Sequence, residues 1–160
     1  MSRTTALAAF ALAAASLIPV AATAADEPEL KWAFVAGVPR PVEMAIVSGN
    51  PDEAGPYVVR YRMPSGMRFA PHKYSDQREL TVVKGIWWMT PGESYNWRDM
   101  TEYQQGSVIV REAGKPYYAW ARTAVLIEEK GTGPSTLQYV NPEDDPRNKR
   151  KPRRKGSGEE

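Results

Sequence analysis

The sequence predicts an all-β domain, because short strand-like runs recur between turn signals and no segment after residue 25 has the 3.6-residue period of a helix. The clearest run, at 57–63, alternates between two faces. One face carries Tyr57, Val59, Tyr61 and Met63, and the other carries Val58, Arg60 and Arg62. This alternation is typical of a half-buried strand with its arginines outward. Many such runs, spaced by about 8–12 residues, indicate a β-barrel or β-sandwich.

The other elements follow from the same signals. Further strands are expected at 43–48, 80–83, 85–89, 107–111, 117–122, 124–129 and 136–140. A strand–turn–strand unit occupies 66–85, with a polar corner between its strands. The polar stretch 90–102, which contains proline, glycine and asparagine, predicts a long loop that carries Tyr95 and Trp97.

The N-terminal 25 residues predict a cleaved signal peptide. Arg3 precedes an apolar, alanine-rich run at 6–20, and Ala22–Ala24 has the small-x-small pattern of a cleavage site. A membrane anchor is the alternative, but the run is short for a span of about 20 residues and lacks a basic stop-transfer flank. The chain has no cysteine, so disulfides, a lipid-modified cysteine and cysteine-bound zinc are excluded. We therefore expect a periplasmic or secreted protein.

A chain of 160 residues favours one domain. The expected parts are a signal peptide at 1–25, a barrel domain at 26–143 and a disordered basic tail at 144–160 that buries nothing. Within the barrel domain, Leu30, Trp32 and Phe34 are two apart, so an extended strap would place them on one face against the barrel.

The basic residues are concentrated in the tail. The segment 147–155 has seven of them, whereas residues 25–146 hold 13 basic and 17 acidic residues. In an exported protein such a tail makes at most a weak contact with anionic membrane headgroups. It lacks the interleaved aromatic residues that single-stranded nucleic acids require, so no nucleic-acid partner is expected.

The stretch from Gly66 to Gly85 resembles the first motif of the cupin family. That motif runs glycine, five residues, His-x-His, three or four residues, glutamate, and a glycine after the next strand. Gly66, His72 and Gly85 fit it, whereas Tyr74 stands at the second histidine and Arg78 at the glutamate.

A second stretch resembles the other cupin motif, which ends in Pro-x-Gly and a histidine. Gly106 and Gly114 fit, but Glu112 replaces the proline and Tyr117 the histidine. The resemblance covers roughly residues 30–147, and this part of the chain is similar to a bacterial subgroup of small exported cupins. It implies a single jelly-roll β-barrel, the cupin-type fold. Cupins typically bind iron, manganese, zinc or nickel through three histidines and a glutamate.

The substitutions predict a degenerate metal site. His72 and Tyr74 lie two apart and face the same way, into the barrel of a cupin, and Arg78 shares a face with inward apolar positions. A guanidinium repels a divalent cation and cannot donate an electron pair. We therefore expect no cofactor and no catalysis, but a small anionic or carboxylated ligand held in the barrel. The expected ligand-binding residues are His72, Tyr74, Arg78, Tyr117, Trp120 and Tyr61, with Trp87 or Trp88 as a further wall.

Two alternatives remain open. A bulge at the corner before Arg78 would turn Glu79 inward and allow a metal-dependent dioxygenase or isomerase, with iron, manganese, nickel or zinc on ligands drawn from His72, Glu79, Tyr74 and Tyr117. In the other, the barrel is simply filled, and Arg78 pairs with Glu79, Glu112 or Asp76.

Trp87 and Trp88 are adjacent on a strand, so one faces inward and one outward. An outward tryptophan, together with Tyr95 and Trp97 of the following loop, predicts an exposed aromatic patch. Such patches mark a dimer interface or the rim of a binding site. A homodimer is therefore expected.

Overall fold

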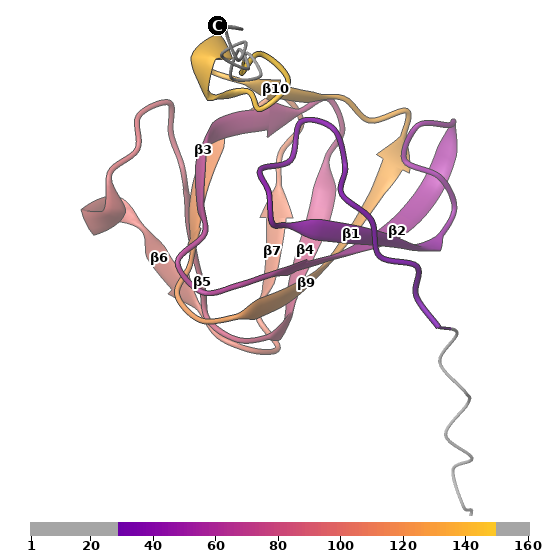
Figure 1. Ribbon diagram of the computed structural model, residues 1–160, viewed down its shortest axis with the longest axis horizontal. Helices are drawn as coiled ribbons and strands as arrows, with labels where there is room; N and C mark the ends of the chain where they lie inside the picture. Colours follow the sequence, from indigo (N-terminus) through magenta and orange to yellow (C-terminus); the bar gives the residue numbers. More distant parts are fainter. Residues whose placement is uncertain (1–28, 150–160) are drawn as a thin grey trace, which may run out of the picture.

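The computed structural model describes residues 29–149, which form two five-stranded antiparallel sheets facing each other as the halves of a barrel (Figure 1). The first sheet is ordered β1 (Glu43–Ser48), β2 (Gly55–Met63), β9 (Val125–Gly133), β4 (Arg78–Lys84) and β7 (Val108–Arg111). The second is ordered β10 (Leu137–Tyr139), β3 (Arg68–Tyr74), β8 (Tyr117–Ala121), β5 (Trp87–Pro91) and β6 (Thr101–Tyr103). The predicted all-β class and jelly-roll barrel are confirmed, while the signal peptide lies outside the described residues.

The alternation read from β2 fits the barrel. Tyr57, Val59 and Met63 are buried, whereas Arg62 is exposed on the outer side. Because neighbouring strands repeat this pattern, their inner faces build one apolar core between the sheets. The core consists of Val42, Met63, Phe69, Leu80, Val82, Trp87, Met89, Ile109, Tyr117, Ala119, Ala121, Val125 and Ile127.

The predicted loop at 90–102 is partly ordered. It contains a short 3-10 turn, η1 (Trp97–Asp99), and the beginning of β6, neither of which was predicted. The Asn96 side chain accepts a hydrogen bond from the backbone N–H of Arg98 and caps the turn. Figure 1 shows this turn projecting from the side of the barrel beyond β6.

The N-terminal strap only partly follows its prediction. Ala33 forms an isolated antiparallel β-bridge with Met44 of β1. The Arg62 guanidinium packs over the Trp32 ring, with its Cζ 4.5 Å from the ring centroid. Phe34 was expected on the barrel, but it is 46% exposed and packs against Arg40 instead. A single side-chain face along the barrel is therefore not formed.

The C-terminal residues hold the loop that follows the strap. The Tyr139 hydroxyl donates to the Gly37 carbonyl at 2.8 Å, and Arg147 lies against Gly37. Arg147 also donates to both carboxylate oxygens of Asp145 and to the Leu137 carbonyl. Asp145 is buried, so the expectation that nothing is buried from residue 144 onward is wrong. The rest of the predicted tail, 150–160, lies outside the described residues.

A second 3-10 turn, η2 (Pro142–Asp144), leads into this C-terminal contact. Within the described range 29–149, the search for an apolar helix long enough to cross a bilayer gives none.

The two glycines that frame the first motif have nearly the same backbone conformation and different surroundings. Gly66 has φ 89° with open space where a Cβ would stand, and Gly85 has φ 90° with the Ala124 carbonyl oxygen there. We expect Gly66→Ala to lower the free energy of unfolding by about 1–2 kcal/mol, because the left-handed backbone conformation is the single source of strain for an alanine there. Gly85→Ala should cost about 1–3 kcal/mol more because a backbone atom must move. Urea unfolding of both variants measures the difference, and equal losses would contradict the packing argument.

Candidate functional site

A cavity opens between the two sheets, under the loop that follows the strap. Its volume is about 40 Å³, counted as the space open to the centre of a water molecule. One water needs about 10–15 Å³ by this measure, so the cavity admits a few waters or a small molecule. Its lining consists of Val38, Pro39, Val42, Tyr61, Met63, Phe69, His72, Tyr74, Trp87, Met89, Arg111, Ala119, Ile127, Glu129, Leu137 and Tyr139.

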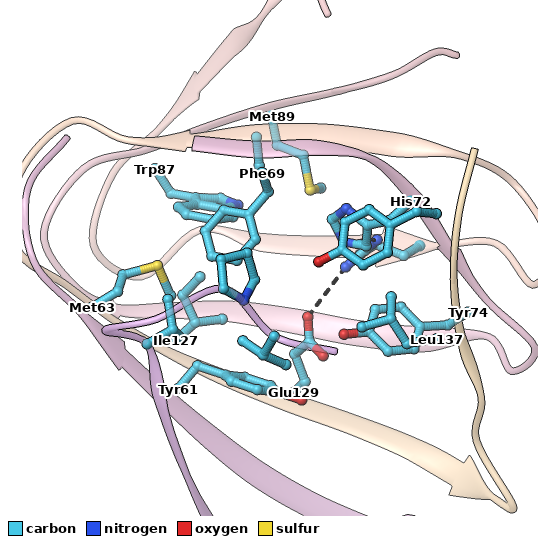
Figure 2. Close-up of a pocket in the computed structure, with 16 residues that line it drawn as sticks. Tyr61, Met63, Phe69, His72, Tyr74, Trp87, Met89, Ile127, Glu129 and Leu137 are labelled. Carbon is cyan, nitrogen blue, oxygen red and sulfur yellow. Dashed lines mark hydrogen bonds and ion pairs between the residues drawn. The ribbon is translucent and has the colours of Figure 1, made fainter. Parts of the chain in front are cut away.

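The cavity has an apolar end and a polar end. Figure 2 shows Trp87, Phe69, Met63 and Ile127 gathered at one end and His72, Tyr74 and Glu129 at the other. Such a division suits a molecule with a hydrocarbon part and one polar head.

Strand β3 supplies the histidine. As predicted, His72 and Tyr74 point the same way, and both line the cavity. Phe69 also lines it, although an odd spacing from His72 would place it on the opposite face of a regular strand. The pairing of β3 with β8 shifts register between Phe69 and His72, and this irregularity brings both side chains inward.

Both ring nitrogens of His72 are engaged. Nδ1 lies 2.8 Å from the Ala70 carbonyl oxygen, and Nε2 lies 3.1 Å from Nη2 of Arg111. A carbonyl only accepts and a guanidinium only donates, so we assign the proton of the neutral ring to Nδ1. Burial, and then the positive charge of Arg111, lower the pKa of His72 to about 3. His72 is thus a neutral hydrogen-bond acceptor at physiological pH.

Glu129 of β9 is shared by two buried arginines. Its Oε2 accepts from Nη1 of Arg78 at 2.6 Å, and its Oε1 lies 3.4 Å from Nη1 of Arg111. The shorter contact is a strong charge-assisted hydrogen bond, whereas the longer one is beyond the usual range. Arg78 is therefore firmly paired with Glu129, and Arg111 is held loosely.

Arg78 has two further partners on the side away from Glu129. Its Nη2 donates to Asp76 at 2.9 Å and to Ser135 at 2.6 Å. Burial alone would lower the pKa of Arg78, but the charge of Glu129 raises it above its usual value. For Asp76, burial would raise the pKa, and hydrogen bonds from Tyr57, Ser135 and Arg78 bring it below its usual value. Both groups are therefore charged at physiological pH.

The Tyr74 ring lies near both guanidiniums. The Cζ of Arg78 is 3.4 Å from the Tyr74 ring centroid, and that of Arg111 is 5.1 Å from it. Burial, followed by the charge of Glu129, raises the pKa of Tyr74. Burial and the neighbouring Tyr74 likewise raise the pKa of Tyr61 well above its usual value. Both phenols stay neutral and serve as hydrogen-bonding groups rather than phenolate ligands.

The structure separates the predicted site residues. His72, Tyr74 and Tyr61 line the cavity, as expected of them. Arg78 is buried, but it lies behind Tyr74 and does not line the cavity. Tyr117 lies beside Arg111, and its hydroxyl accepts from the Glu112 backbone N–H at 3.4 Å rather than reaching the cavity.

The prediction that Trp120 forms a wall of the pocket is wrong. Ala119 and Ala121 of β8 are buried in the core, so the residue between them faces outward. Of the adjacent pair on β5, Trp87 is the inward one and lines the cavity. Trp88 packs edge-on against Trp120.

Three further polar residues line the cavity and were not predicted: Arg111, Glu129 and Tyr139. The alternation that identified β2 carries a signal for two of them. Arg111 shares a face with Ile109, and Glu129 shares one with Ile127. A charged residue in phase with buried apolar positions was the sign of an inward charge.

The residues present do not fit the metal that a cupin fold implies. Glu79 is exposed on the outer face of β4, where its Oε1 lies 3.9 Å from Nζ of Lys130. The alternative in which a bulge turns Glu79 inward as a metal ligand beside His72 is therefore wrong. The His72 nitrogen that faces Arg111 already accepts a hydrogen bond from it. Among residues 29–149, no three His, Cys, Asp or Glu side chains are grouped so that they could hold a metal ion.

Comparison with known proteins places the fold. No protein-family model matches the sequence, and no curated protein sequence matches it. Among solved structures, the polyketide cyclase RemF from Streptomyces resistomycificus is similar at a TM-score of 0.62 and 14% identity, over 78% of this chain and 89% of that one.

Two further structures agree with it. An RmlC-like cupin from Shewanella frigidimarina has a TM-score of 0.53 and 10% identity, over 65% of this chain and 84% of its own. Salicylate 1,2-dioxygenase from Pseudaminobacter salicylatoxidans has a TM-score of 0.53 and 13% identity, over 65% of this chain and 32% of its own. Identities this low indicate a shared fold and carry no activity with them. The protein has the double-stranded β-helix fold of the cupin superfamily.

Proposed function

We propose that this protein is an exported cupin that binds a small carboxylate in its barrel, at a site that no longer binds a metal. The observation that carries the proposal is the state of Arg111. Its guanidinium is buried at the polar end of the cavity, and its contact with Glu129 is long. A buried guanidinium without a close counter-charge is costly, and a ligand carboxylate reduces that cost.

The surroundings support a carboxylate with a short hydrocarbon part. His72 accepts from Arg111 and holds one edge of the guanidinium in place. The hydroxyls of Tyr61 and Tyr74 lie at the same end, and burial keeps both protonated. The opposite end is lined mainly by apolar side chains, and the volume restricts the ligand to a few carbon atoms.

Calorimetric titration with straight-chain carboxylates from acetate to octanoate tests the proposal, with the alcohols of equal length as controls. We expect the short carboxylates to bind and the alcohols not to bind. Arg111→Gln should weaken binding about tenfold or more, because a charge-assisted hydrogen bond is lost. Arg62→Gln, which removes an exposed arginine outside the barrel, is the matched control and should change nothing.

Three outcomes would contradict this function. If no carboxylate binds, the barrel is simply filled. If Arg111→Gln binds as well as the wild type, Arg111 does not hold the ligand. If the protein purified without a metal-affinity tag holds near-stoichiometric iron, manganese, nickel or zinc by mass spectrometry, the metal-dependent dioxygenase or isomerase is favoured instead.

Leu137→Trp, at the partly exposed lining of the cavity, adds a variant that blocks the cavity without touching the charged residues.

A further inference from the structure

A second concave site lies outside the barrel, on the outer face of the sheet that contains β3, β8 and β5. It is lined by Arg68, Trp88, Trp97, Trp120 and Arg122, which together we call the outer groove. Its volume is about 310 Å³ by the measure that gives about 40 Å³ for the barrel cavity. The outer groove is thus open to much larger molecules than the barrel.

Strand register builds the floor of the outer groove. Arg68 of β3 pairs with Trp120 of β8, which pairs in turn with Trp88 of β5. Neighbouring strands are about 4.8 Å apart, so this row is about 10 Å long. Trp97, on the projecting turn η1, extends it and is 48% exposed.

The turn that carries Trp97 is anchored to the barrel. The Tyr118 hydroxyl of β8 donates to the Asn96 carbonyl at 3.2 Å, and the Tyr118 ring packs on Tyr95 at 5.3 Å between centroids. These contacts hold Trp97 in place before any ligand arrives, which lowers the entropic cost of binding.

Tryptophan rings position both arginines of the outer groove. The Cζ atoms of Arg68 and Arg122 lie 4.6 and 4.0 Å from the Trp120 ring centroid, and that of Arg122 lies 4.6 Å from the Trp88 centroid. A guanidinium in such a contact keeps its N–H edge available for a carboxylate. Neither side chain has an ion pair or hydrogen bond with another residue of 29–149.

Hydrogen-bond donors outnumber acceptors around the outer groove. The guanidiniums of Arg68 and Arg122 are the accessible donors, whereas Trp120 Nε1 and the Tyr95 hydroxyl are buried and out of reach of a ligand. The neighbouring carboxylate, Glu102, already accepts from Trp88 Nε1 and from Gln104, each at 3.0 Å. The missing component is an acceptor-rich, negatively charged molecule.

We infer that the outer groove binds an acidic polysaccharide, a chain of sugar rings that carry carboxylates. The carboxylates match the free guanidinium edges of Arg68 and Arg122. The apolar faces of the sugar rings match the exposed indole of Trp97. A chain molecule also suits a row of side chains that crosses three strands.

Two other occupants fit less well. A second copy docked with its two-fold axis through the outer groove would place the arginines of one groove against those of the other. A single-stranded nucleic acid needs free aromatic faces on which its bases stack. Here two arginines lie over the Trp120 ring, and Arg98 lies over one face of Trp97 at 4.9 Å. The remaining face of Trp97 suits one sugar ring, but a run of stacked bases needs several aromatic side chains.

Binding of the full chain to polygalacturonate, measured by calorimetry at several salt concentrations, tests the inference. We expect binding to polygalacturonate and none to neutral dextran. The double variant Arg68→Gln/Arg122→Gln should raise the Kd about tenfold or more. Trp97→Ala, which alters an exposed side chain and leaves the core intact, should also weaken binding.

The matched control is Arg40→Gln/Arg62→Gln. It removes two arginines that also lie over aromatic rings, those of Phe34 and Trp32, but away from the outer groove. The control should bind like the wild type, and both variants keep the basic tail. Equal weakening in the two double variants would overturn the inference, as would no binding by the wild type. Tighter binding to poly(U) or to phosphatidylglycerol vesicles would overturn it as well. The site shares no residue with the barrel cavity, so this test and the short-carboxylate test fail independently.

Discussion

Glu129→Gln is expected to lower the free energy of unfolding by about 3–5 kcal/mol, because it leaves two buried guanidiniums without their shared carboxylate. Arg78 and Glu129 are almost fully buried, and the atoms that join them are 2.6 Å apart. The uncharged glutamine retains an acceptor but supplies no charge to offset Arg78 and Arg111. Urea unfolding, followed by tryptophan fluorescence, measures the loss.

The adjacent glutamate provides the control for this prediction. Glu128 lies on the other face of β9, where it pairs with Arg60 at 2.9 Å and lies 3.7 Å from Lys130. Glu128→Gln makes the same chemical change next to the first site, in a partly exposed pair, and should cost about 1 kcal/mol or less. Similar losses in the two variants would mean that the Arg78–Glu129 pair contributes no more than a surface ion pair.

Acidification is expected to destabilise the protein through His72. The folded-state pKa is about 3, whereas an unfolded histidine titrates near 6.5. Between these values the unfolded chain binds a proton and the folded chain does not, so stability is full above pH 6.5 and falls as the pH falls toward 3. The loss between pH 7 and pH 4.5 should be about 2–3 kcal/mol. Urea unfolding at pH 7, 5.5 and 4.5 measures it.

His72→Gln isolates the contribution of the histidine. The glutamine carbonyl can still accept a hydrogen bond from Arg111, and all carboxylates are retained, so the wild type should lose more stability than the variant between pH 7 and 4.5. His72 is the only histidine in the chain, so its imidazole NMR signals can be assigned without ambiguity. A ring that titrates near pH 6.5 in the folded protein would rule out the buried contact with Arg111.

The Glu129 and His72 variants alter the two neighbours of the Arg111 guanidinium. In a metal-binding cupin, the histidine nitrogen and the inward carboxylate would bind a cation. Here, Arg111 lies between His72 and Glu129, and its guanidinium supplies the positive charge. Loss of either neighbour exposes the cost of a buried charge, and the proposed ligand reduces that cost.

Local sequence patterns predicted much of the barrel. Period-two alternation located β2 and showed that His72 and Tyr74 point the same way. The glycines at 66 and 85 marked turns at which positive φ is required, and both have it. Such features depend on a few consecutive residues, so they can be predicted from a single sequence.

The composition of the charged network depended on tertiary structure. Glu129 lies 51 residues from Arg78, and Arg111 lies 39 residues from His72. Alternation within a strand shows which residues share a face, but it does not show which residue of a distant strand comes opposite. The sequence therefore left Glu79, Glu112 and Asp76 as possible partners of Arg78, and strand pairing selected Asp76 and added Glu129.

Trp120 shows the same division between local and tertiary information. We expected it at the wall of a ligand pocket inside the barrel, yet β8 places the small Ala119 and Ala121 inside and the tryptophan outside. The interior beside β8 already holds Phe69, Trp87 and Met89, and a close-packed core has no room for another indole. The sequence by itself determined the fold class and the alternation of its strands. Packing between sheets decided which aromatic residues fill the core and which line the outer groove, because it depends on the volumes contributed by all strands together.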